Sequence, residues 1–181
     1  MRLCCYLLLF LLLPLSSTFS QIKTANILYI DTAFSYVGVK EATGKNDGYE
    51  VEKFLKSVGR KKGDSWCAAF VSYCLTVTNH PFPVRSGLSR AFVTKQSIYA
   101  TKVLQGQNEV ACGDLAIWQN GNTISGHIAI VVIADKTKFI TIEGNTSSGK
   151  GKQSDGDGVY IKERTIQPYN YFRIKWFTKI N

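Results

Sequence analysis

The sequence predicts an α+β domain in which helices come first and an antiparallel sheet follows. Apolar residues recur at helical spacing between residues 25 and 37 and again between 49 and 58. Beyond Gly113 the pattern changes to short runs rich in β-branched and aromatic residues, separated by polar loops. The chain has 181 residues and no internal repeat. It therefore has room for one sizeable core and hardly for two.

The helical half is divided by glycine and proline. Gly59 ends the second helical stretch, and a basic loop, GRKKGD, follows it. Asp64 or Ser65 is expected to cap a third helix that ends near Val77. The two prolines of HPFPVRSG require an extended or turned segment, and residues 91–104 are predicted to be helical again.

Five strands are expected after Gly113, because each run combines strand-forming residues with flanking turn residues. The predicted strands are DLAIW, GHIAIVVIA, KFITIEGN, GVYIKERT and YFRIKWFTKI.

The first twenty residues resemble a secretory leader. Arg2 precedes an almost wholly apolar run over residues 3–15, and small residues follow up to Ser20. That run is too short to span a bilayer, so we predict a signal peptide over residues 1–20 and a single mature domain over 21–181. An uncleaved anchor is the alternative. The mature protein is expected to be secreted or periplasmic, with no stable membrane anchor.

The chain is basic, with 22 Lys and Arg residues against 13 Asp and Glu residues and a net charge of +9. Loss of Arg2 with the leader leaves a charge of about +8. This balance favours an anionic partner such as nucleic acid, acidic lipid or a bacterial wall polymer. No arginine-rich helix or aromatic RNA-binding motif accompanies the charge, so nucleic acid is not expected. A soluble protein with a basic surface is the simpler alternative.

Three cysteines remain after the leader: Cys67, Cys74 and Cys112. If the third helix starts at its expected cap, Cys67 lies in the first turn, where the helix dipole favours a thiolate. Cys74 lies two turns further on, about 10 Å away by helix rise, which is too far for a disulfide between the two. A bond between Cys74 and Cys112 is compatible with packing of the helix on the sheet, and two reduced, buried thiols are the alternative. Neither Cys67 nor Cys74 belongs to a CxxC pair, so no metal site is predicted.

Polar residues interrupt two apolar strands. His127 begins GHIAIVVIA, and Glu143 lies inside KFITIEGN, where an unpaired buried carboxylate would be costly. A hairpin turning at residues 135–138 places His127 beside Glu143 or Asn145 on one face of the sheet. A carboxylate or amide there could hold the histidine ring and its tautomer.

In this order and spacing, WCAAFVSYC, GDLAIW, GHIAIVV and IEGN resemble the CHAP family of cysteine amidohydrolases and peptidases. The resemblance covers roughly residues 27–175. It implies a papain-like fold related to the NlpC/P60 enzymes, with N-terminal helices packed on an antiparallel sheet. It also implies a nucleophile at Cys67, a base at His127, an orienting acid at Glu143 and an assisting amide at Asn145.

The resemblance further implies peptidoglycan or another wall peptide as substrate. The reaction would be that of an N-acetylmuramoyl-L-alanine amidase or of a stem or cross-bridge endopeptidase. Trp66, Lys61 and Lys62 are expected to contact this substrate, and the protein is expected to be a monomer without a cofactor. Some relatives carry an acidic calcium-binding loop, whereas Asp64 is the only acid of RKKGDSW, so no calcium site is carried over. A non-catalytic wall-peptide-binding protein and an antibacterial toxin-like amidase are the alternatives.

Overall fold

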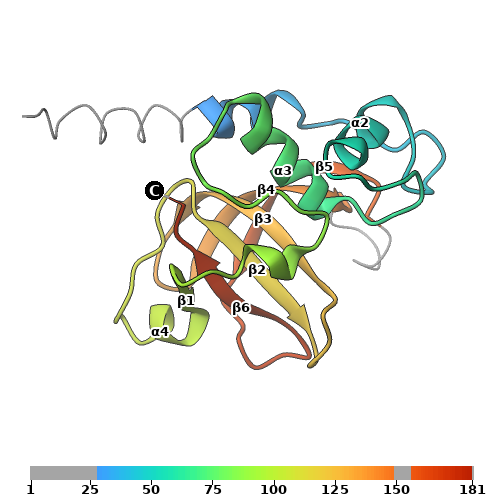
Figure 1. Ribbon diagram of the computed structural model, residues 1–181. Helices are drawn as coiled ribbons and strands as arrows, with labels where there is room; N and C mark the ends of the chain where they lie inside the picture. Colours follow the sequence, from blue (N-terminus) through green and yellow to red (C-terminus); the bar gives the residue numbers. More distant parts are fainter. Residues whose placement is uncertain (1–27, 149–155, 181) are drawn as a thin grey trace, which may run out of the picture.

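The computed structural model describes residues 28–148 and 156–180, and the predicted leader lies outside the described residues. Helices precede most of the strands, as predicted (Figure 1). None of the helices within the described ranges is long and apolar enough to cross a membrane. Residues 28–35 are helical. They are followed by α2 (Tyr49–Ser57), α3 (Cys67–Val77), the 3-10 helix η1 (Ser89–Phe92), β1 (Ser97–Tyr99) and α4 (Ala100–Leu104).

The remaining strands complete a six-stranded antiparallel sheet in the order β1-β6-β2-β3-β4-β5. Their bounds are β2 (Leu115–Asn120), β3 (Gly126–Ala134), β4 (Lys138–Thr146), β5 (Gly158–Thr165) and β6 (Phe172–Thr178). The α+β prediction and all five expected strands are confirmed. The helix predicted over residues 91–104 is largely wrong, because that segment contains the end of η1, the short strand β1 and the five-residue helix α4.

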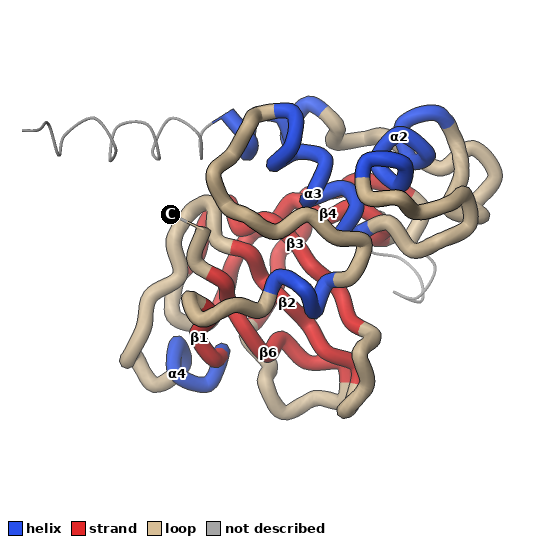
Figure 2. The backbone as a smooth tube through the Cα atoms, viewed as in Figure 1, coloured by secondary structure: helices blue, strands red, loops and turns tan. Residues whose placement is uncertain are grey.

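The helix α3 is the central element of one layer. Its sequence, CAAFVSYCLTV, is apolar nearly all round, and eight of its residues are buried, because the sheet lies on one side and other helical segments on the other. Figures 1 and 2 show α3 over β3 and β4 with α2 beside it. The helix-side core between these layers includes Phe54, Phe70, Leu75, Ile128 and Ile142.

A second core covers the opposite face of the sheet. Alternate residues of the strands point there, as the two-residue period of a strand requires. Its members are Ala100, Val103, Ala116, Trp118, Ala129, Val131, Phe139, Ile166, Ile174 and Phe177. The side chains of α4 close one end of this opposite-face core. Both faces of the sheet are therefore apolar, which explains the nearly continuous apolar run of GHIAIVVIA.

Close packing between α3 and β4 depends on Gly144. A Cβ atom placed there would lie 2.7 Å from Cζ3 of Trp66 and 2.9 Å from Cβ of Phe70. Such distances are not tolerated, so any side chain at this position would push the strand and the helix apart. The glycine of IEGN thus sets the separation between the strand that carries Glu143 and the helix that carries Cys67.

We expect Gly144→Ala to destabilise the fold by about 1–3 kcal/mol, the usual cost of overpacking a well-packed core. Urea unfolding of residues 21–181 would measure the change. A free energy of unfolding equal to that of the wild type would contradict the close approach.

Candidate active site

Cys67 is the first residue of α3, and its exposed fraction is 7%. Trp66 occupies the N-cap without a side-chain hydrogen bond, so the expected cap at Asp64 or Ser65 is wrong. Asp64 instead accepts a hydrogen bond from the backbone N–H of Lys61 at 3.1 Å, because the loop turns back before the helix starts. The expectation that Cys67 lies in the first turn is confirmed. Its thiol therefore lies at the positive end of the helix dipole.

His127 lies between Cys67 and Glu143. Its Nε2 is 2.9 Å from Oε2 of Glu143, and a carboxylate can only accept, so Nε2 carries a proton. Nδ1 is then the nitrogen available to the thiol of Cys67, to which the ring is also hydrogen-bonded. Burial lowers the pKa of His127, but the hydrogen bonds to Cys67 and Glu143 outweigh burial and raise it to about 9.

Glu143 is completely buried, and every acceptor position of its carboxylate is used. Oε1 accepts from Oγ1 of Thr141 at 2.6 Å and from Nε of Arg164 at 2.7 Å. Oε2 accepts from His127 and from Nη2 of Arg164 at 2.6 Å. Burial raises the pKa of this carboxyl, but the bonds to Arg164 and His127 hold it well below its usual range. Glu143 is therefore ionised at neutral pH.

Arg164 is a site residue that the sequence reasoning missed. It binds Glu143 through two parallel hydrogen bonds, and its guanidinium carbon lies 5.6 Å from the ring centroid of Trp118. The ring centroids of Trp118 and His127 are 5.6 Å apart. The available signal was the need of a buried carboxylate for a cation, but β5 offers both Lys162 and Arg164, and only the fold selects between them.

Asn145 lies on the other side of the site, toward α3. Its Oδ1 accepts from the backbone N–H of Trp66 at 3.0 Å, and its Nδ2 donates to Asn46 Oδ1 and Gly156 O, each at 3.1 Å. Its φ of 55° is left-handed, a conformation that asparagine tolerates better than most residues. Asn145 thus ties β4 to the residue immediately before Cys67.

Of the three residues expected to contact substrate, Trp66 does not reach the surface. Its side chain is fully buried, and its Nε1–H donates to Glu41 at 2.9 Å, so this expectation is wrong. Lys61 is exposed. Lys62 is exposed too, but its Nζ lies 3.4 Å from a carboxylate oxygen of Asp47 and 3.7 Å from one of Glu52. The positive charge of Lys62 is therefore shared with acids of its own chain.

The proposed bond between Cys74 and Cys112 is not present, since both are free thiols in the structure. Cys74 is fully buried in α3, and burial raises its thiol pKa far above the usual value. Cys112 is exposed. The alternative of two reduced, buried thiols therefore holds for Cys74 but is wrong about the burial of Cys112. Within the described ranges, no group of three or more His, Cys, Asp or Glu side chains could hold a metal ion.

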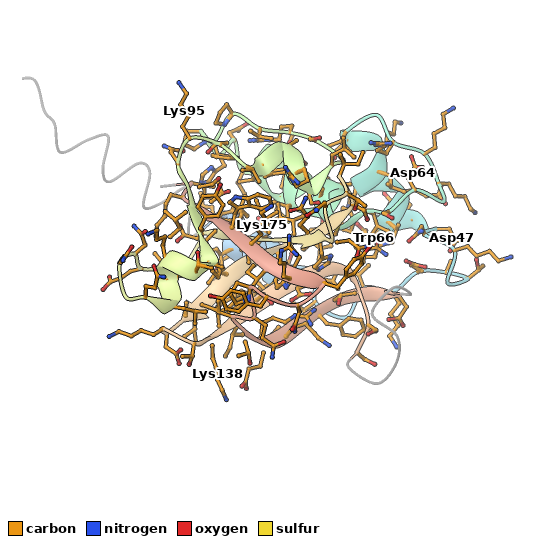
Figure 3. The ribbon with its side chains drawn as sticks, turned by 90° about the horizontal axis from the view of Figure 1, so that it is seen from below. Asp47, Asp64, Trp66, Lys95, Lys138 and Lys175 are labelled. Atoms are coloured by element: carbon orange, nitrogen blue, oxygen red, sulfur yellow. The ribbon has the colours of Figure 1, made fainter. Side chains whose placement is uncertain are left out.

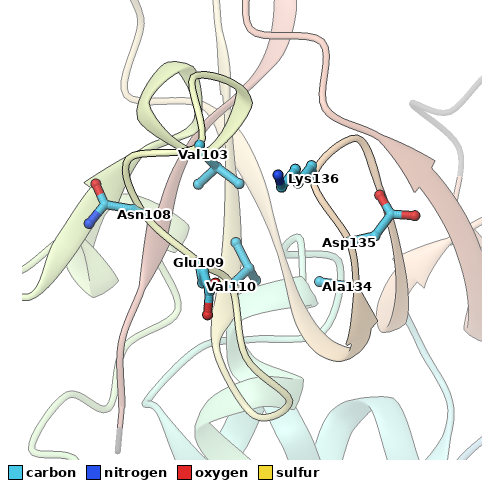
Figure 4. Close-up of a pocket in the computed structure, with 8 residues that line it drawn as sticks. Val103, Asn108, Glu109, Val110, Ala134, Asp135 and Lys136 are labelled. Atoms are coloured by element: carbon cyan, nitrogen blue, oxygen red, sulfur yellow. The ribbon is translucent and has the colours of Figure 1, made fainter.

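A cavity of about 280 Å³ lies away from these residues (Figure 4). Val103 of α4, Val110, Glu109 and Lys136 are among the residues that line it. Lys136 belongs to the turn at the end of β3 that is remote from His127. None of the predicted site residues lines this cavity.

Comparison with known families decides what kind of domain this is. The family model described as the CHAP domain matches residues 59–145. Residues 59–145 are similar to the CHAP domain. The matched range begins in the loop before α3 and contains Cys67, His127, Glu143 and Asn145, whereas Arg164 lies beyond it. The predicted CHAP resemblance is thus confirmed.

Among solved structures, this chain is similar to the crystal structure of a wild type endolysin, LysIME-EF1. The sequence identity is 14% and the TM-score is 0.49. The match covers 86% of this chain and 62% of the endolysin chain. No curated protein matches this chain.

The two histidines should titrate far apart, and this can be measured. Burial and the nearby Arg85 lower the pKa of His80 to about 4, whereas that of His127 is raised to about 9. Nuclear magnetic resonance titration of the mature chain should resolve both. Glu143→Gln should move the pKa of His127 down toward 6.5, because a neutral amide no longer favours the imidazolium, and should leave His80 unchanged.

The raised pKa of His127 also makes the free energy of unfolding depend on pH. Since the folded pKa of His127 lies above the unfolded value, its contribution is complete below pH of about 6.5 and is lost as pH rises through about 9. Glu143→Gln should flatten this decline in urea unfolding. An identical decline in the variant would show that Glu143 does not raise the pKa of His127.

Removal of the Arg164 guanidinium should be costly only while Glu143 is charged. We expect Arg164→Met to destabilise the fold by about 3 kcal/mol at pH 7, because it removes two hydrogen bonds and one of the two cations that compensate the buried carboxylate. Much of that loss should be recovered in the double variant with Glu143→Gln, as a double-mutant cycle in urea would show.

The exposed pair Lys138–Glu163 provides a matched control, with side chains 60% and 63% exposed. Lys138→Met should cost much less stability than Arg164→Met, because solvent screens the exposed pair. Equal losses for Lys138→Met and Arg164→Met would contradict the argument.

Proposed function

We propose that the protein is a peptidoglycan hydrolase that cleaves amide bonds with Cys67 as nucleophile. The observation that carries this proposal is the continuous contact chain from Cys67 through His127 to Glu143 at the start of α3. Such a series of contacts joins a nucleophile, a base and a group that orients the base. The CHAP match over the same residues supports the same class of reaction.

In the proposed reaction, Nδ1 of His127 already holds the proton of the Cys67 thiol at neutral pH, because the pKa of His127 is about 9, and the thiolate attacks the amide carbonyl. The resulting imidazolium returns that proton to the leaving amine as the C–N bond breaks, which leaves a thioester on Cys67. Water, deprotonated by His127, then hydrolyses the thioester and restores the thiol. Glu143 holds the proton on Nε2 throughout, so that Nδ1 faces the sulfur.

The start of α3 offers donors for the negative charge that develops on the carbonyl oxygen. The first helical hydrogen bond is donated by the N–H of Phe70 to the carbonyl of Trp66. The N–H groups of residues 67–69 precede that bond and have no partner within the helix. Asn145 fixes the backbone of Trp66, so it would help to keep these donors in place.

The mature protein, residues 21–181, would act outside the cytoplasm as a monomer without a cofactor. Either an N-acetylmuramoyl-L-alanine amidase or an endopeptidase acting within the stem or cross-bridge fits the proposed chemistry, because each hydrolyses an amide bond. The predicted signal peptide over residues 1–20 supports the location, and the Cys67 site supports the reaction.

Digestion of purified peptidoglycan should decide between these activities. The mature protein, kept reduced, and its Cys67→Ala variant are incubated with the wall material, and the products are identified by mass spectrometry. We expect products only from the wild type. Free glycan strands with intact stem peptides would indicate an amidase, and shortened stems an endopeptidase.

His127→Ala should lower the rate by at least about a hundredfold, because the general base is lost. The matched variant His80→Gln lies outside the proposed site and should retain activity if it folds. Binding of the wild type to wall material without any product would contradict the enzyme and favour a wall-peptide-binding protein.

A further inference from the structure

Two cations contact one tryptophan on the side of the sheet that faces the helices, and a third lies near one of them. The Arg90 guanidinium of η1 lies 4.6 Å from the ring centroid of Trp176, and Nζ of Lys175 lies 4.5 Å from it. Arg173 lies on β6 two residues before Lys175, and it pairs with Gln119 of β2. Nζ of Lys175 donates to Oε1 of Gln119 at 2.6 Å. We call Arg90, Arg173 and Lys175 the Trp176 cation cluster; Lys175 is labelled over β6 in Figure 3.

The Trp176 cation cluster has no acidic partner among the residues that the structure describes. None of its members forms an ion pair with Asp or Glu there. Nε of Arg90 is buried and lacks a hydrogen-bond partner in the same described part of the chain. By contrast, the partly buried Arg164 and Lys179 each hold a carboxylate. The fold therefore neutralises these two cations but leaves the Trp176 cation cluster unneutralised.

Crowded like charges are unfavourable unless something compensates them. Burial lowers the pKa of Lys175, and the nearby Arg173 and Arg90 lower it further. Arg90 and Lys175 contact the face of an aromatic ring, which holds cations in place but does not neutralise them. A bound anion would compensate all three charges.

The register of the sheet places the cluster near the Cys67 site. Gln119 pairs with Gly126 of β3, and Gly126 directly precedes His127. Neighbouring strands lie about 4.8 Å apart, so the backbone of Arg173 on β6 is about 10 Å from β3. An extended peptide rises about 3.3 Å per residue and covers that distance in about three residues.

We propose that Arg90, Arg173 and Lys175 form a subsite for a carboxylate of the substrate peptide, about three residues from the bond that Cys67 cleaves. The inference rests on the proposed function, because it takes the wall peptide as substrate. Arginine suits a carboxylate because its guanidinium can donate two parallel hydrogen bonds. The Trp176 ring beside them holds both cations in place for that contact.

The subsite can be tested with soluble glycan fragments that carry stem peptides. They are released from purified peptidoglycan by a muramidase and used native or with their carboxylates amidated. Lys175→Gln and Arg90→Gln should each raise KM about tenfold on native fragments and leave kcat within about twofold. Amidated fragments should give the wild type the same higher KM and should show no further effect of either variant.

Two controls accompany this comparison. Lys102→Gln removes the same charge from an exposed position of α4 and should not change KM. Arg90→Lys keeps the charge and should recover part of the affinity, which a merely structural role of Arg90 would not predict. Thermal unfolding of each variant checks that it folds.

A direct binding measurement separates this inference from the proposed function. Calorimetry with Cys67→Ala should show about tenfold weaker binding of native fragments when Lys175→Gln is added. Absence of turnover by the wild type would overturn the hydrolase, whereas the binding result would still decide the subsite. Equal affinity with and without Lys175→Gln, or loss of affinity only for a phosphate-rich wall polymer, would overturn the carboxylate subsite.

Discussion

Most of the site depends on how the fold compensates one buried carboxylate, that of Glu143. Burial without partners would be prohibitively costly, so strands β3, β4 and β5 must each supply a donor to it. These donors are His127, Thr141 and Arg164. The requirement fixes the tautomer of the histidine, because a saturated carboxylate leaves Nε2 only the role of donor. It also makes Arg164 and His127 share one negative charge, which links the basicity of the site to a residue outside the matched CHAP range.

The site lies where the two cores of the domain meet. Cys67 belongs to the helix-side core, whereas His127 contacts Trp118 of the opposite-face core. Gly144 sets the approach of α3 to β4, and Asn145 then ties the strand to the backbone at the start of the helix. Sulfur and imidazole are therefore held by two separately packed layers, and their relative position is as rigid as the contact between those layers.

The net charge of the sequence does not show which of its basic residues are available to bind an anionic partner. The net charge of +9 pointed to an anionic partner, and the basic loop at Lys61 and Lys62 was its most visible source. In the fold, Lys62 lies beside acids of its own chain, whereas Lys175 and Arg90 meet over Trp176 without acids. These two residues are 85 positions apart in the sequence. Only the pairing of β6 with β2 and the packing of η1 on the sheet bring them together.

The sequence by itself determined the α+β class, the five longer strands, the position of Cys67 in the first helical turn and the face shared by His127 and Glu143. These features follow from local periodicity and from one short hairpin, whose register the side-chain pattern restricts. Tertiary structure decided the rest. The partner of Glu143 on β5, the burial of Trp66, the separate positions of Cys74 and Cys112 and the Trp176 cation cluster all depend on contacts between distant segments. Such contacts are set by the packing of whole layers, which no local pattern encodes.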